Sequence, residues 1–126
     1  MTRETGPKGE DIAAEYLLRR GLSIRERGRR DRLGEIDIIA EDGETLVFVE
    51  VKARTAGTPG GEPWEKITPS KLRRICRIGE SYAQAMGLDD RPMRIDVVGI
   101  TFDGDQAETA HYKDVTRFMP PPRNRL

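Results

Sequence analysis

The apolar positions near the start of the chain recur with a helical period. Between residues 8 and 20 the apolar stripe is formed by Ala13, Ala14, Leu17 and Leu18. Gly21 follows, and glycine is favoured just after the last turn of a helix. Glu10 lies on the same stripe one turn earlier, where a carboxylate needs a partner or a task. The pattern predicts a helix over residues 8–20 that carries Glu10 on its buried side.

Alternating apolar and polar positions follow this helix. Residues 22–27 alternate weakly and predict an edge strand. Residues 35–40 and 46–53 alternate clearly and are joined by Glu41-Asp42-Gly43-Glu44. Asp-Gly between two such runs is a strong hairpin signal, so we expect a two-residue turn at Asp42-Gly43.

The second half of the chain returns to a helical pattern. Residues 56–67 contain several glycines and prolines and predict a mobile loop. Thr68 is a suitable N-cap, and Pro69 suits the first helical position. The apolar stripe up to Gly87 is formed by Leu72, Ile75, Cys76, Gly79, Tyr82, Ala83 and Met86.

Two further strands complete the pattern, at residues 94–102 and 107–112. A helix between two strands can act as the crossover of a parallel pair. We therefore expect an α/β fold, with a mixed sheet and helices on its faces. Residues 1–118 would form one domain, and residues 119–126 a disordered tail rich in proline and arginine.

Composition limits the class of protein. The 126 residues suffice for one domain, and basic and acidic side chains balance to a net charge of zero. Cys76 is the single cysteine, which excludes an internal disulfide and fits a reducing compartment. No apolar run is long enough to span a membrane or to form a signal peptide, so we expect a cytoplasmic protein without membrane contact.

Basic side chains are unevenly distributed although the net charge is zero. Arginines crowd the segment from Arg19 to Arg32, and a second cluster consists of Lys71, Arg73, Arg74 and Arg77. Such clusters are either solvated surface or phosphate contacts. Arg29 and Arg30 lead directly into the hairpin, which favours phosphate contact there.

The hairpin gathers acids and a lysine on one face. With the turn at Asp42-Gly43, Asp37 faces Phe48 and lies diagonal to Glu50, at about 7–8 Å between backbones. The apolar face carries Ile36, Ile38, Val47, Val49 and Val51. The other face carries Glu35, Asp37, Ile39, Leu46, Phe48, Glu50 and Lys52.

Two carboxylates beside a lysine suit the hydrolysis of a phosphodiester. Asp37 and Glu50 offer the oxygen ligands that Mg²⁺ or Mn²⁺ prefers. Lys52 can orient the attacking water or stabilise the transition state. Glu10 can complete the shell of the ion, or it can be a helix N-terminal acid that complements the dipole. A Glu-x-Lys on a strand is also a common solvated pair.

The remaining residues that could be reactive are better explained by structural roles. His111 is the single histidine, which argues against a histidine-based site, and we expect it on a strand surface. Cys76 lies on an apolar stripe and is expected in the core. Trp64 suits a packing anchor better than a base-stacking platform.

These residues together resemble the YraN-like family, a bacterial group similar to archaeal Holliday-junction resolvases within the restriction-endonuclease-like, PD-(D/E)xK, superfamily. The resemblance covers about residues 6–118. Its motifs are Gly9-Glu10, Gly34-Glu35-Ile36-Asp37, Val47-Phe48-Val49-Glu50-Val51-Lys52 with Arg54, Thr68-Pro69 with Lys71, and Arg94-Ile95-Asp96-Val97-Val98. The chain departs from the pattern at Arg27-Gly28, where many relatives have Arg-Asn, and in the loop at residues 60–65.

The resemblance implies a restriction-endonuclease-like core with Asp37 and Glu50 as metal ligands and Lys52 as the catalytic lysine. Glu10 takes the place of the helix carboxylate of resolvase-like members. We therefore expect a Mg²⁺-dependent (or Mn²⁺-dependent) endonuclease for branched or structured DNA. The expected phosphate contacts are Arg29, Arg30, Arg54, Lys71 and Arg74.

Cleavage of a four-way junction needs two sites and therefore a two-fold homodimer. Two alternatives remain open at this stage. One is a non-catalytic nucleic-acid-binding or scaffold protein that retains the fold. The other is a protein-interaction module, which leaves the arginine clusters unexplained.

Overall fold

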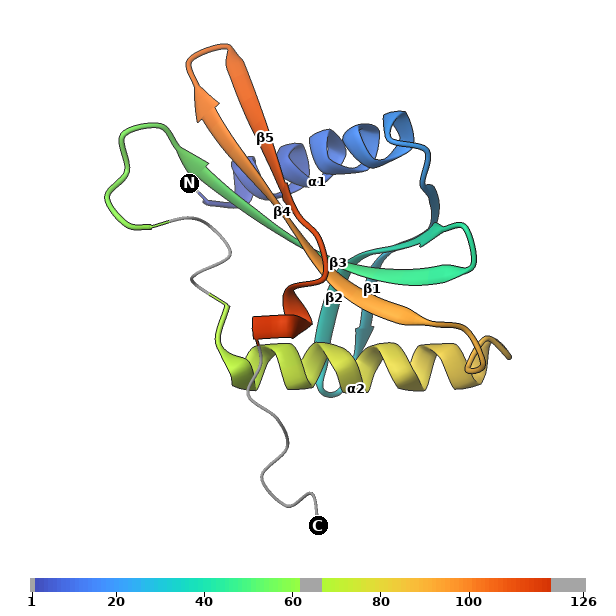
Figure 1. The fold of residues 1–126 in the computed structure, drawn as a ribbon. Helices are drawn as coiled ribbons and strands as arrows, with labels where there is room; N and C mark the ends of the chain where they lie inside the picture. The colour runs from blue at the N-terminus through green and yellow to red at the C-terminus, as the bar shows by residue number, and fades with distance from the viewer. Residues whose placement is uncertain (1, 62–66, 119–126) are drawn as a thin grey trace.

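A five-stranded mixed sheet forms the centre of the molecule, with a helix on each face (Figure 1). The computed structural model describes residues 2–61 and 67–118. The elements in chain order are α1 (Thr2–Arg19), β1 (Ser23–Asp31), β2 (Gly34–Asp42), β3 (Thr45–Thr55), α2 (Pro69–Ala85), β4 (Met93–Asp103), β5 (Gln106–Tyr112) and the 3₁₀ helix η2 (Val115–Phe118).

The strands lie in sequence order across the sheet. β3 and β4 are parallel and are joined through α2, whereas the other neighbouring pairs are antiparallel. The predicted α/β class, mixed sheet and crossover helix are confirmed. The first helix begins at Thr2, earlier than the expected residue 8, and the edge strand β1 continues to Asp31.

Two apolar cores separate the helices from the sheet. Under α1, Leu17 packs with Val47 and Val49. Under α2, Leu72 and Ile75 belong to the core that contains Ile39, Leu46 and Phe48. The strand alternation predicted this division, except for Ile36, which belongs to the α2 core instead of sharing the face of Ile38. Regular pairing of β2 with β3 ends at Ile38, so alternation relative to β3 fails beyond it.

The register of the hairpin differs from the expected one by two residues. Asp42 pairs with Thr45, so the turn is Gly43-Glu44 and not Asp42-Gly43. Gly43 has a φ of 61°, a conformation that glycine adopts without strain. Phe48 consequently faces Ile39 and not Asp37. Because side chains alternate with a period of two, a shift of two residues keeps the side chains of the paired residues 38–42 on their predicted faces.

Helix α2 begins as expected and ends slightly earlier. The Thr68 side chain accepts a hydrogen bond from the Lys71 backbone N–H at 3.1 Å, which confirms the N-cap. Met86 is the C-cap and is 44% exposed, so its predicted place on the buried stripe is wrong. Ile78, which is 2% exposed, extends that stripe instead.

Some expectations fall on other parts of the chain. Trp64, the centre of the predicted loop and the tail lie outside the described residues. Within the described residues, no helix is long and apolar enough to cross a membrane.

Candidate active site

Asp37 lies on β2 immediately beyond the last regular β2–β3 pair, Ile38–Val49. Its Oδ2 accepts a hydrogen bond of 2.8 Å from the Val51 backbone N–H. The carboxylate therefore occupies a backbone acceptor position where the two strands stop pairing. This bond fixes the Asp37 side chain between β2 and β3.

Two further carboxylates approach Asp37. Glu10 from α1 and Glu35 from β2 each offer an oxygen, and the ligand atoms of the three residues lie within 4.8 Å of one another. Gly9 permits this approach, since a Cβ at its position would lie 3.3 Å from the Ala53 Cβ on β3. The helix stripe thus places Glu10 beside the sheet, half-buried, as the sequence predicted.

The crowding changes the protonation of Asp37. Burial and the nearby Glu50 raise its pKa to about 7, against the lowering effect of the Val51 hydrogen bond. Glu10 and Glu35 add to the increase. The pKa of Glu10 is also raised, by burial, although Arg27 at 3.7 Å opposes this.

Arginines partly neutralise the negative charges of Glu10 and Glu35. Arg27 contacts Glu10, and Arg30 lies 2.9 Å from Glu35. Within residues 2–61 and 67–118, no arginine or lysine forms an ion pair with Asp37. Asp37 is therefore the carboxylate of the group with the least compensation, and a cation would stabilise its charged form.

Glu50 is buried on the neighbouring strand, with a side chain 7% exposed, and is held by two lysines. Its Oε2 lies 2.7 Å from Lys71 Nζ and 3.7 Å from Lys52 Nζ. Lys71 comes from the first turn of α2, next to the Thr68 cap, so the helix start places it over the sheet. Glu50 affects the pKa of Asp37, but Glu35 and not Glu50 completes the closest group of three carboxylates.

The two lysines differ in their electrostatics. Burial and the charge of Lys71 lower the pKa of Lys52, although Glu50 opposes the shift. Burial also acts to lower the pKa of Lys71, but the hydrogen bond and charge of Glu50, together with Lys52 and Asp37, outweigh this and the pKa is raised. Lys71 is thus the closer ion-pair partner of Glu50, and Lys52 is the lysine that can turn more easily toward a ligand.

Most of the expected phosphate contacts already have partners within the chain. Arg29 pairs with Glu26 and lies 5.1 Å from the centroid of the Tyr82 ring, while Arg30 pairs with Glu35. Arg54 donates to the Gly61 carbonyl and the Thr101 hydroxyl, and Lys71 is bound to Glu50. Arg74 lines a cavity of about 220 Å³ with Ser70, Arg73 and Arg77 of α2 and Leu33 of the β1–β2 turn.

The expectation for His111 is wrong. Its side chain is 9% exposed, and its Nε2 lies 2.8 Å from Oδ2 of Asp96, which is fully buried. The signal available in the sequence was an acid in the middle of the apolar run 94–102. Cys76 packs against the α2 core but is only partly buried, and burial raises the pKa of its thiol.

The donor set fits a hard divalent cation. Glu10, Glu35, Asp37 and Glu50 offer only oxygen atoms, the ligand type of Mg²⁺ and Mn²⁺. Burial and, after it, the negative charge of Glu50 raise the pKa of Asp37, and a cation would neutralise that charge. Lysine ammonium groups next to this set can meet a phosphate oxygen without competing for the ion.

The family model and the similar proteins all point to the same family. Residues 9–100 match the model of the family described as "Uncharacterised protein family UPF0102". A UPF0102 protein of Symbiobacterium thermophilum is 46% identical over 100 residues, 79% of this chain and 84% of that one. A UPF0102 protein of Anaeromyxobacter dehalogenans is 41% identical, and the match covers 85% of this chain and 79% of that one. A UPF0102 protein of Rhodococcus jostii is 43% identical, and the match covers 86% of this chain and 92% of that one.

Proposed function

This chain belongs to the UPF0102 family, the YraN-like group indicated by its motifs, and we propose that it is a metal-dependent endonuclease of the cytoplasm. Its substrate would be branched or otherwise structured DNA, and its reaction the hydrolysis of phosphodiester bonds. The observation that supports this most is Asp37, which is half-buried among other carboxylates and is influenced by Glu50, the partner of two lysines.

The topology supports membership of the restriction-endonuclease-like superfamily. A helix that carries Glu10 precedes an antiparallel hairpin that carries Asp37, Glu50 and Lys52, and a crossover helix leads to a parallel strand. The acids and lysine come from separate elements that meet where β2 and β3 stop pairing.

Glu10, Asp37 and Glu50 would hold Mg²⁺ or Mn²⁺, with Glu35 close enough to take part. When bound, such an ion lowers the pKa of a water ligand and neutralises charge on phosphate oxygens. The Val51 N–H keeps the Asp37 carboxylate oriented while its second oxygen stays available. Glu50 would give up part of its contact with the two lysines in order to bind the ion.

The lysines would act on the phosphate. Lys52, on the same strand face as Glu50, can donate hydrogen bonds to a non-bridging phosphate oxygen and orient the attacking water. Lys71 keeps Glu50 in place and adds a second positive charge. The arginines of α2 offer contacts for more distant phosphates of the DNA.

The decisive experiment is a cleavage assay with labelled four-way junction, flap and single-stranded DNA, in Mg²⁺, Mn²⁺ or chelator. We expect metal-dependent cleavage by the wild type and a loss of at least about a hundredfold in Asp37→Asn and Lys52→Met. Asp105→Asn, at an exposed position in the β4–β5 turn, is the matched control and should cleave normally. Cleavage that persists in both site variants would exclude the proposed site.

One observation favours a second function. Glu50 is already neutralised by Lys71 and Lys52, which is the state expected of a non-catalytic nucleic-acid-binding protein that retains the fold. Salt-sensitive binding of the same DNAs without cleavage in any metal would support this function. Sedimentation of the bound complex would show whether two copies assemble, as junction cleavage requires.

A further inference from the structure

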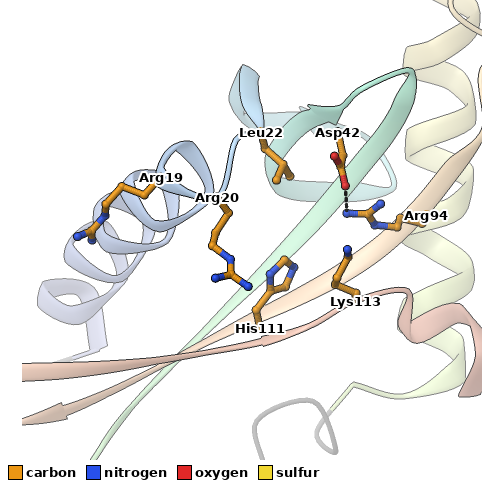
Figure 2. A pocket seen from close by; sticks show the side chains of 7 residues that line it. All are labelled: Arg19, Arg20, Leu22, Asp42, Arg94, His111 and Lys113. Carbon is orange, nitrogen blue, oxygen red and sulfur yellow. Dashed lines mark hydrogen bonds and ion pairs between the residues drawn. The ribbon is translucent and has the colours of Figure 1, made fainter.

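A second polar cavity lies away from the carboxylate group, at the C-terminal end of α1 (Figure 2). It has a volume of about 450 Å³. Its lining residues are Arg19, Arg20, Leu22, Asp42, Arg94, His111 and Lys113. None of them belongs to the candidate active site. Glu10 and Arg19 are nine residues apart on one helix, which separates the two regions by about 13 Å along α1.

The positive charges of the cavity exceed its negative ones. Asp42 is its one acidic lining residue, and its Oδ2 lies 3.0 Å from Arg94 Nη2. Among the described residues, Arg20 and Lys113 form no ion pair with a carboxylate. Figure 2 shows Arg20, His111 and Lys113 directed into the same space, whereas Arg19 points away from it. Two positive charges therefore remain available to a ligand.

The inner wall of the cavity is rigid. Asp96, which is fully buried, accepts from Arg94 Nε at 3.0 Å and contacts His111 Nε2 at 2.8 Å. Burial opposes the ionisation of Asp96, but these bonds and one from the Asp114 N–H outweigh it and keep its pKa below the usual value. The other ring nitrogen of His111 lies 3.3 Å from the Tyr16 hydroxyl. These contacts fix Arg94 and His111 before any ligand arrives.

Hydrogen bonds within the chain close the C-terminal end of α1, which reduces the repulsion that its last carbonyls exert on an anion. The Arg20 N–H bonds to the Tyr16 carbonyl at 3.1 Å, and the Leu22 N–H bonds to the Leu17 carbonyl at 3.0 Å. Gly21 makes this closure possible with a φ of 94°, as its place in the sequence predicted. With the bond of the Gly21 N–H to the Leu18 carbonyl, the carbonyls of residues 16–18 all have partners within the chain. The Arg20 guanidinium lies 5.6 Å from the centroid of the Tyr16 ring.

We propose that this cavity binds a phosphoryl group carried on a larger molecule. Arginine and lysine with fixed neighbours are the side chains that bind phosphate oxygens through charge-assisted hydrogen bonds. The volume lies within the range of pockets that hold nucleotide-sized ligands, so it exceeds the need of a bare phosphate ion. The group can come from a free nucleotide or from a nucleic-acid strand.

The test is a titration followed by the backbone amide shifts of Arg20, His111 and Lys113, in chelator and at constant ionic strength. The probes are inorganic phosphate, adenosine monophosphate and a short DNA duplex. We expect saturable shifts with the phosphate and the mononucleotide. Arg20→Gln/Lys113→Gln should weaken this binding by at least about tenfold. Arg32→Gln, which removes an exposed arginine elsewhere, should not change it.

The three probes also identify the source of the phosphoryl group. A duplex that shifts the same amides and competes with the mononucleotide points to nucleic acid. A duplex that leaves them unchanged, while the mononucleotide saturates, points to a free phosphorylated molecule. The proposal is overturned if no probe gives a saturable shift or if the double variant binds as tightly as the wild type. Because no divalent ion is present, the result does not depend on cleavage activity.

Discussion

At the scale of single residues, Asp37 links the candidate site to stability. Its pKa is about 7 in the folded chain, well above the ordinary value of 3.8, because of burial and the charge of Glu50. Between these values the unfolded chain releases the proton and the folded chain keeps it, so stability falls as the pH rises from about 4 to 7. Above pH 7 the full destabilisation is present.

We therefore predict that Asp37→Asn stabilises the metal-free protein at pH 8 by about 3–8 °C in melting temperature. The asparagine keeps an acceptor for the Val51 N–H, so the hydrogen bond is retained. Thermal melts in chelator at pH 4 and pH 8 test this, and the difference should vanish at pH 4. A variant that melts below the wild type at both values would show that Asp37 stabilises the fold as a charged group.

Lys71 affects its neighbour through charge. Its ammonium lowers the pKa of Lys52, while Glu50 is occupied by Lys71 at 2.7 Å. In Lys71→Met, the repulsion is lost and Glu50 is free to interact with Lys52. We expect the pKa of Lys52 to rise, which a pH titration of the Lys52 side-chain NMR signals measures. An unchanged or lower pKa would mean that the two lysines are not electrostatically coupled.

The sequence offered local signals for some residues of the candidate site and none for others. The alternation of the hairpin placed Asp37, Glu50 and Lys52 on one face, and the motif resemblance added Glu10. Glu35 lay on that face too, but its closeness to Glu10 depends on how α1 crosses the sheet, which no local pattern encodes. The burial of His111 likewise depends on a partner 15 positions away, Asp96.

At the scale of elements, the contact of α2 with the sheet depends on Gly79. A Cβ at this position would lie 2.5 Å from Phe48 Cε2, inside the packed core. We predict that Gly79→Ala destabilises the protein by about 1–3 kcal/mol, because overpacking outweighs the gain in helix propensity. Urea unfolding followed by circular dichroism measures the loss.

The matched control for this substitution is Ser81→Ala on the exposed side of the same helix. It tests helix propensity without changing the core, and should be neutral or slightly stabilising. A stable Gly79→Ala protein would mean that α2 can shift away from Phe48 without cost.

The hairpin shows which part of an element a sequence specifies. Glycine at a turn can occupy either central position, so Asp42-Gly43 and Gly43-Glu44 were both compatible with the pattern. The structure selects the second turn, which changes the cross-strand partners by two residues. The paired side chains keep their predicted faces of the sheet because side chains alternate along a strand with a period of two. Ile36 departs from its predicted face because β2 and β3 no longer pair there, and the alternation rule assumes continuous pairing.

At the scale of the whole molecule, two kinds of polar site lie at different positions along α1. Near the middle of α1, Glu10 joins the acids of the hairpin, and at its C-terminal end Arg20 faces a basic cavity. Helix α1 therefore contributes to both sites: the carboxylate group, which suits a cation, and the basic cavity, which suits an anion. This distribution explains how a chain with a net charge of zero can still present a strongly charged surface at each site.

Binding of a cation to the acidic group should stabilise the whole fold, since the unfolded chain does not bring these acids together. We predict that Mg²⁺ or Mn²⁺ raises the melting temperature at pH 8, and that the increase saturates with concentration. Glu10→Gln replaces one carboxylate of the group with a neutral amide. It should reduce the metal-induced increase in melting temperature by half or more. Glu15→Gln on the same helix, whose carboxylate is exposed and 3.7 Å from Arg19, should leave it intact. An equal response of the two variants would indicate nonspecific ion binding and would remove the metal from the proposed mechanism.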